Sequence, residues 1–146
     1  MTGDRKEDDG ADDAATPAPP CSFAPDRIYA ELGTDGAIGL IPLTPDFWPS
    51  LIEGRREIGG YLLMQVDAKT DMTHWEMHPE GDELILRLSG RITFEVETDT
   101  GLAEVALEAA APLCLVPRGH WHRYRVQEAG QLLFVTFGRG TQHRPG

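Results

Sequence analysis

Apolar and polar residues alternate in short segments along most of the chain. The clearest example is residues 91–97, where Ile92, Phe94 and Val96 share one face of an extended strand and polar side chains occupy the other. Residues 44–51 contain two prolines and predict at most one helical turn. Similar apolar runs, each bounded by turn-forming residues, predict strands at residues 26–32, 39–43, 60–66, 72–78, 83–89, 91–97, 102–107, 113–116, 122–126 and 131–137.

This succession of short strands is typical of a β-sandwich or a β-barrel. The 16 glycines and 11 prolines favour the same all-β class, because both residue types mark turns. A chain of 146 residues is long enough for one domain with a substantial core and too short for two. We expect that domain to span residues 24–139.

The two ends of the chain differ from this central region. Residues 1–23 are rich in acidic residues, alanine and proline, and they cannot bury enough apolar surface to offset the entropy lost on ordering. We therefore expect a disordered acidic tail there. Residues 140–146 predict a flexible C-terminus.

The charge of the chain limits its partners. A formal net charge of −11 argues against binding to nucleic acid or to an anionic membrane, because both require a basic surface. No segment approaches the ~18 apolar residues of a membrane span, and the first residues lack the apolar core of a secretory signal. Two cysteines offer no disulfide framework. We expect a cytoplasmic protein with no nucleic-acid or membrane partner.

The residues with the clearest chemical potential lie in and after one strand. Side chains two positions apart share a strand face, so His74, Glu76 and His78 project together. The turn that follows brings Glu83 to the start of the next strand, within reach of His78. A later turn delivers His122 onto another strand. Because a core face is normally apolar, such a collection of ligand-capable side chains indicates a functional pocket.

The spacing of these residues resembles that of a known family. His78, followed after four residues by Glu83 and after six more by Gly90, is similar to the first cupin motif from its second histidine onward. The pattern Pro-x-Gly-x-x-His at residues 117–122 resembles the second cupin motif and ends at His122. The two motifs occur in the family's order, and the resemblance covers roughly residues 61–137.

The resemblance implies an all-β fold, a cupin-type double-stranded β-helix (a jelly-roll barrel) in a single domain. It also implies a divalent transition metal, with iron, manganese, nickel and zinc all compatible with nitrogen and oxygen ligands. Carried over by position, the metal ligands are Glu76, His78, Glu83 and His122.

The chain departs from the family pattern at three positions. Thr70 and Ala111 replace glycines, and Glu76 replaces the first histidine of motif one. A carboxylate still suits the metals named above. Without a metal, one of Glu76 and Glu83 is expected to take up a proton, because two carboxylates would face each other in a poorly solvated pocket. The alternative is a metal-free pocket in which the polar residues are hydrogen-bonded to one another.

Three further residues are predicted to contact a small-molecule ligand. His74 lies one pleat further from the turn than Glu76 and is expected to line the pocket rather than to bind the metal. Arg87 shares the strand face of Glu83 and would grip a substrate carboxylate, or else lies at the barrel mouth or pairs with an acid at a subunit contact. Tyr124 either lines the cavity or packs in the core.

The resemblance implies a metal-dependent enzyme acting on a small organic molecule, either a dioxygenase or an isomerase. The alternative is a metal-free cupin that binds a small molecule as a sensor or carrier, without catalysis. An interaction-only protein is the weakest hypothesis, because such a protein has little reason to line a cavity with carboxylates and imidazoles.

Leu84, Leu86 and Leu88 form an apolar stripe on the strand face opposite Glu83. An uncovered stripe of this kind promotes aggregation, so either the N-terminal strands or a second subunit is expected to cover it. Small cupins commonly dimerise through their sheets, and the resemblance therefore implies a homodimer.

Overall fold

The structure is a computed structural model that describes residues 19–146. Residues 1–18 of the predicted acidic tail lie outside the described residues. No helix within the described part of the chain is long and apolar enough to cross a membrane.

The described residues form eleven strands and one short helix, which differ only at their ends from most of the segments predicted from the sequence. The helix, α1, spans Phe47–Ile52, slightly more than the single turn expected. The strands are β1 Ile28–Leu32, β2 Ile38–Pro42, β3 Tyr61–Ala68, β4 His74–Met77, β5 Glu83–Arg87, β6 Arg91–Thr98, β7 Gly101–Leu107, β8 Leu113–Val116, β9 His122–Glu128, β10 Gly130–Thr136 and β11 Gln142–Pro145.

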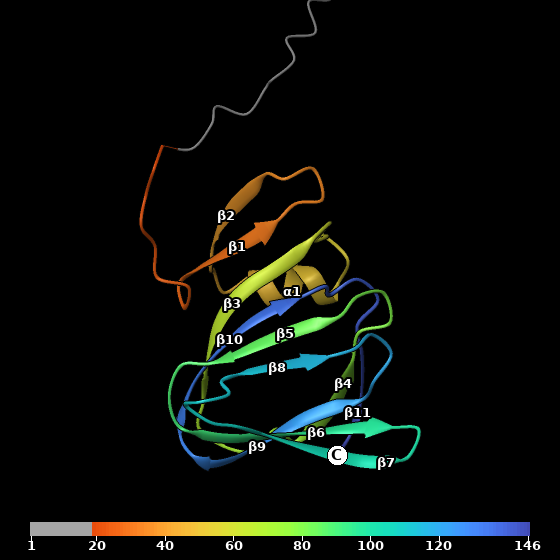
Figure 1. The fold of residues 1–146 in the computed structure, drawn as a ribbon. Helices are drawn as coiled ribbons and strands as arrows, with labels where there is room; N and C mark the ends of the chain where they lie inside the picture. The colour runs from red at the N-terminus through yellow and green to blue at the C-terminus, as the bar shows by residue number, and fades with distance from the viewer. Residues whose placement is uncertain (1–18) are drawn as a thin grey trace, which may run out of the picture.

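The strands form two antiparallel sheets that face each other (Figure 1). The six-stranded sheet has the order β2-β1-β3-β10-β5-β8, and the five-stranded sheet has the order β11-β4-β9-β6-β7. Neighbouring strands are often distant in the sequence: β10, for example, pairs with both β3 and β5. This crossing of the chain between two facing sheets is the jelly-roll arrangement, and it confirms the predicted all-β class.

One hydrophobic core lies between the sheets and draws residues from both. The alternation in β6 places Ile92, Phe94 and Val96 in this core, each no more than 5% exposed. From the opposite sheet, Ile85 and Leu132 are fully buried against them. A smaller core of Tyr29, Phe47 and Leu62 attaches α1 to β1 and β3.

The C-terminal residues correct one expectation from the sequence. Residues 140–146 were expected to be flexible, but Gln142–Pro145 forms β11 and pairs with β4. Arg144 explains the order, because its guanidinium lies over the rings of Trp75 and Trp121 and forms an ion pair with Glu97. The barrel therefore continues past residue 139.

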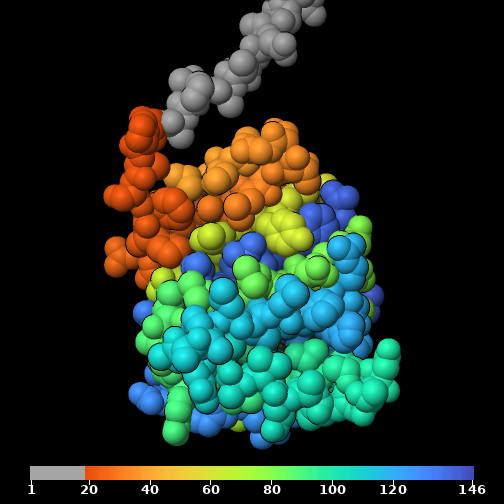
Figure 2. Space-filling model, viewed as in Figure 1, coloured from red at the N-terminus to blue at the C-terminus, as the bar shows by residue number. Residues whose placement is uncertain are grey.

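The N-terminal strands do not cover the leucine stripe. They extend the six-stranded sheet beyond β3, at the edge opposite β8, and leave the outer face of β5 and β8 open (Figure 2). Leu84 is 40% exposed and its cross-strand neighbour Leu115 is 62% exposed. Among the described residues, the N-terminal strands therefore do not provide the cover that the sequence suggested for the stripe.

Candidate metal centre

The four side chains that the sequence predicted to converge do meet in the structure. Glu76 lies in β4, His78 follows the end of that strand, and Glu83 and His122 are the first residues of β5 and β9. Each offers one ligand atom, and these atoms all lie within 4.8 Å of one another. Three strand pairings set this geometry: β4 pairs with β9, which places Glu76 directly opposite His122, and β5 is held in register by β10 and β8.

The two loops that carry motif residues are joined by hydrogen bonds from two backbone amides. The amide of Gly119 donates to the carbonyl of His78 at 2.9 Å, and the amide of Arg118 donates to Asp82 Oδ1 at 2.9 Å. Gly119 has φ +80°, a conformation that favours glycine, which explains why the Pro-x-Gly-x-x-His pattern needs that residue. The loops therefore bring His78, Glu83 and His122 to one end of the barrel.

The polar atoms of the cluster are closely spaced. His78 Nε2 lies 3.4 Å from both Glu76 Oε1 and Glu83 Oε1. His122 Nε2 lies 2.9 Å from Glu83 Oε2 and 3.8 Å from Glu76 Oε1. The side chains of Glu83 and His122 are each 1% exposed, whereas that of Glu76 is 20% exposed. Glu76 is thus the member that faces the opening.

The other nitrogen of each imidazole is engaged away from the cluster. His78 Nδ1 lies 2.8 Å from Thr141 Oγ1, and His122 Nδ1 lies 2.9 Å from the carbonyl of His120. That carbonyl can only accept, so His122 carries a proton on Nδ1 and presents Nε2 to the cluster. Thr136 Oγ1 donates to Glu83 Oε1 at 2.6 Å. Metal-binding histidines and carboxylates are oriented by outer partners of this kind.

Three buried atoms of the cluster have no hydrogen-bond partner among the described residues. They are His78 Nε2, Glu83 Oε2 and His122 Nε2. The 2.9 Å approach of Glu83 Oε2 to His122 Nε2 is close but is not aligned as a hydrogen bond. Buried polar atoms are nearly always satisfied in folded proteins. A cation placed among these three atoms would satisfy all of them, so the residues present fit a metal ion.

The charge state of the metal-free cluster differs from the sequence expectation. Burial lowers the pKa values of His78 and His122, but the adjacent carboxylates of Glu76 and Glu83 outweigh it and raise these pKa values to about 9 and about 10. Against the opposing effect of burial, the two imidazoles hold the pKa values of both carboxyls below 4.5. The expectation of a protonated carboxyl is therefore wrong: the imidazoles take the protons.

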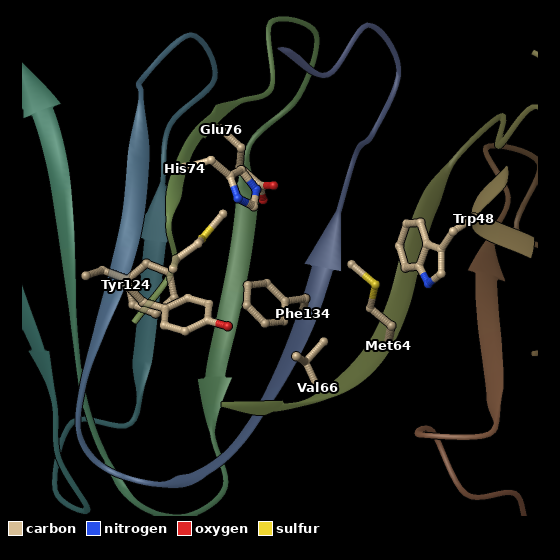
Figure 3. A pocket seen from close by; sticks show the side chains of 9 residues that line it. Trp48, Met64, Val66, His74, Glu76, Tyr124 and Phe134 are labelled. Carbon is tan, nitrogen blue, oxygen red and sulfur yellow. The ribbon is translucent and has the colours of Figure 1, made fainter. Parts of the chain in front are cut away.

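A cavity of about 180 Å³ lies against this cluster, between the sheets (Figure 3). Glu76 belongs to both, since its carboxylate faces the cluster while it also lines the cavity. His74 and Tyr124, two of the predicted ligand-contacting residues, line the same space. The remaining lining residues are all apolar or aromatic: Trp48, Met64, Val66, Met72, Phe94 and Phe134.

Arg87, the third predicted ligand-contacting residue, does not reach the cavity. Its Nε donates to the carbonyl of Gly90 at 2.6 Å, which closes the turn between β5 and β6. Residues at alternate positions of β5 share a face, so Arg87 lies on the same face as Glu83. The fully buried Ile85 separates the two residues. The structure therefore gives no support to a grip on a substrate carboxylate.

Sequence reasoning missed several residues around the site. Thr136 lies directly opposite Glu83 in the β10–β5 ladder, and only the long-range register reveals this. Thr141 and His143 lie in a polar C-terminal segment that carries no strand signal. Trp48, in α1, lines the far side of the cavity (Figure 3). No sequence motif near Trp48 predicts that position.

The facing sheets and the joined motif loops, with the side chains of both motifs meeting inside the barrel, decide the fold. The chain has the fold of a cupin. No protein-family model matches the sequence, and no curated protein sequence is significantly similar to it.

Solved structures with a similar fold include several cupin-type proteins. A hydroquinone 1,2-dioxygenase, PnpCD, in complex with Cd²⁺ and 4-hydroxybenzonitrile, is 20% identical with a TM-score of 0.44; the match covers 52% of this chain and 56% of that chain. A cupin-2 domain containing protein from Shewanella frigidimarina is 16% identical with a TM-score of 0.44, covering 62% and 76%. A variant of Streptomyces PAC13 with uridine is 14% identical with a TM-score of 0.48, covering 58% and 68%.

The chain spans little more than half of the length of the dioxygenase chain that it matches. At these identities the similarity concerns the fold of the barrel.

Proposed function

We propose that this cupin binds one divalent transition metal through Glu76, His78, Glu83 and His122. The observation that carries the proposal is the set of three buried, unpartnered atoms on His78, Glu83 and His122. Two nitrogen and two oxygen donors suit iron, manganese, nickel and zinc. The hydrogen bonds at the outer atoms of the same side chains support this role, because they hold Nε2 of each imidazole towards a common point.

The charge balance of the cluster supports the same proposal. In the metal-free protein, two imidazolium groups face two carboxylates. A dication that displaces the two protons leaves the net charge of the buried cluster unchanged. Exchange of the protons for the metal therefore places no additional net charge in the barrel.

We further propose that the adjoining cavity binds a small organic molecule and that the protein is a metal-dependent dioxygenase or isomerase. An apolar cavity of about 150 Å³ accepts benzene, so the cavity of about 180 Å³ suits a ligand of about one ring. Phe94 and Phe134 would contact the apolar body of that ligand, and Glu76, His74 and Tyr124 offer polar atoms at the cavity wall. A bound metal supplies Lewis acidity or oxygen activation at that end of the cavity.

The chain's own residues perform the remaining tasks. The apolar lining excludes water from the ligand, which strengthens electrostatic interactions within the cavity. The phenol of Tyr124 has its pKa raised by burial and by the charge of Glu76, so it remains a hydrogen-bond donor at neutral pH. His74 offers a second polar contact beside Glu76.

The decisive experiment is elemental analysis of protein purified without a polyhistidine tag from medium supplemented with iron, manganese, nickel and zinc. We expect about one tightly bound metal per chain. The isosteric Glu83→Gln variant should lose most of it, and Glu80→Ala, which removes an exposed carboxylate nearby, should retain it. Wild-type protein that neither contains nor takes up a divalent metal would refute the metal centre.

A metal-free sensor or carrier is the second candidate. It is favoured by one observation, the mutual neutralisation of two imidazolium and two carboxylate groups without a metal. In that case, small apolar molecules should raise the melting temperature of the protein equally with and without a chelator. Stabilisation that depends on added metal would exclude it.

We also propose that the protein is a homodimer. On the outer face of the six-stranded sheet, Val135, Leu84 and Leu115 form one cross-strand row, and Leu133, Leu86 and Leu113 form the next. Leu113 and Leu115 are both more than half exposed in the single chain. A second copy of the same face would cover these rows in an isologous contact.

A further inference from the structure

The carboxylate of Glu76 faces two groups of side chains. Its Oε1 points to the buried cluster, 3.4 Å from His78 Nε2. Its Oε2 lies 3.4 Å from Nε2 of His143, on the side away from that cluster. His74, Glu76 and His143 each offer a ligand atom, and these atoms lie within 4.8 Å of one another. The proposed metal centre therefore uses Oε1 of this carboxylate and leaves Oε2 free for a second interaction.

The strand pairing explains how this second group forms. His74 and Glu76 lie two positions apart on the same face of β4, and β11 pairs with β4 so that His143 is directly opposite Glu76. The next residue, Arg144, points to the other face, where it lies 4.5 Å from the ring centre of Trp121. The stacking of Arg144 thereby fixes the place of His143.

The imidazoles of His74 and His143 are available as ligands. Among the described residues, the hydrogen-bonded imidazoles are those of His78, His120 and His122. The rings of His74 and His143 instead lie 5.2 Å apart with an angle of 60° between their planes, beside Glu76. His143 is 56% exposed, so a cation here would keep water molecules in its coordination shell. Two histidines and one glutamate with open positions form a well-known ligand set for zinc.

We propose that His74, Glu76 and His143 form a second divalent-cation site next to the first. Glu76 bridges the two sites, with Oε1 facing the buried centre and Oε2 facing the outer one. The outer site lies at the edge of the cavity, which His74 and Glu76 also line. The proposal rests on the proposed metal centre only through the shared Glu76, since His74 and His143 take no part in that centre.

The test counts zinc ions bound to the full, tag-free chain. Protein stripped with a chelator is dialysed against buffered Zn²⁺, and the zinc content and affinity are measured at equilibrium. We expect about two zinc ions per chain for the wild type and about one for His143→Ala and for His74→Ala. Glu80→Ala removes an exposed carboxylate that takes no part in either site and should leave about two.

The outcomes separate this proposal from the one on which it rests. In Glu83→Gln, the inner ion should be lost and the outer ion kept. If His143→Ala and His74→Ala bind as much zinc as the wild type, with the same affinity, the outer site is refuted. A wild type that binds one ion, which only Glu83→Gln removes, would refute the outer site and leave the inner metal centre standing. Circular dichroism confirms that each variant is folded.

Discussion

Thr136 donates a hydrogen bond to Glu83 across the β10–β5 ladder, with 2.6 Å between the two oxygens. Both side chains are buried, so no water replaces this bond if it is lost. Thr136→Val keeps the shape of the side chain and removes the hydroxyl. We expect it to weaken metal affinity about 10- to 100-fold, as outer-partner changes do, and to destabilise the metal-free protein by about 2 kcal/mol.

The matched control is Thr136→Ser, which retains the hydroxyl. Its metal affinity, measured by competition with a chromophoric chelator, should stay close to that of the wild type. Equal affinities for the valine variant and the wild type would show that Thr136 does not orient Glu83.

The stability of the metal-free protein should depend on pH. The folded protein holds protons on His78 and His122 with pKa values of about 9 and about 10, against 6.5 for an ordinary histidine. This contribution is complete below pH 6.5 and is lost as the pH rises through 9 to 10. Glu76 and Glu83 have lowered pKa values, so their contribution is complete above pH 4.5 and is lost as the pH falls below it.

Urea denaturation in the presence of a chelator measures this dependence. The midpoint should be highest between about pH 5 and 6.5 and should fall towards pH 9.5. His122→Gln removes one of the two titrating imidazoles and should flatten the alkaline fall. A wild-type midpoint that rises between pH 6.5 and 9.5 would contradict the assigned charges.

Metal binding should release protons. At pH 7.5 both imidazoles of the metal-free cluster are charged, and each must lose its Nε2 proton to become a ligand. Calorimetric titration with Zn²⁺ in two buffers of different ionisation enthalpy should therefore report about two protons released per ion at the buried centre. To isolate that centre, the measurement uses the His143→Ala variant. Release of no protons would mean that the imidazoles are neutral before the metal binds.

The sequence predicted the centre of this site better than its surroundings. Glu76, His78 and Glu83 were placed by strand parity and a short turn, which are local properties. His122 required the resemblance of its motif, because 38 residues lie between it and Glu83 and the β4–β9 pairing is visible only in the fold. Arg87 shows the limit of parity: a shared face does not ensure a shared cavity when Ile85 fills the space between.

The C-terminal strand shows a second limit. The residues of β11 are Gln, His, Arg and Pro, a composition with little preference for strands. Its order comes from tertiary contacts, namely the pairing with β4 and the stacking of Arg144 on Trp75 and Trp121. No periodicity in the segment records such contacts. The place of His143 beside Glu76 therefore follows only from the β4–β11 pairing.

The turn before Glu83 should tolerate no side chain at Gly81. A Cβ there would lie 2.3 Å from the Cβ of Phe137, a distance that forces the backbone to move. Gly81→Ala should destabilise the protein by about 1–3 kcal/mol and weaken metal binding, because the turn positions both His78 and Glu83. Gly39→Ala is the matched control, since a Cβ at Gly39 meets no atom within 4 Å. Denaturant melts of the two variants should differ clearly.

The proposed dimer is tested by a charge on the outer leucine rows. Leu115→Glu places a carboxylate among Leu84 and its neighbours and should convert a dimer of about 32 kDa into the 16.1 kDa chain. Leu102→Glu, on β7 of the other sheet, replaces a leucine that is 53% exposed and should leave the mass unchanged. Light scattering after size-exclusion chromatography gives both masses. A wild type of 16.1 kDa at all concentrations would refute the dimer.

The buried cluster joins the two layers of the barrel. Glu83 belongs to the six-stranded sheet, whereas Glu76 and His122 belong to the five-stranded sheet. Whether the imidazoles are protonated or a metal ion is bound, the attraction between these side chains links the two sheets at one end of the barrel. When this link between the sheets is lost, both sheets lose a stabilising interaction at the same time. Amide hydrogen exchange should therefore become faster in β5 and β9 together.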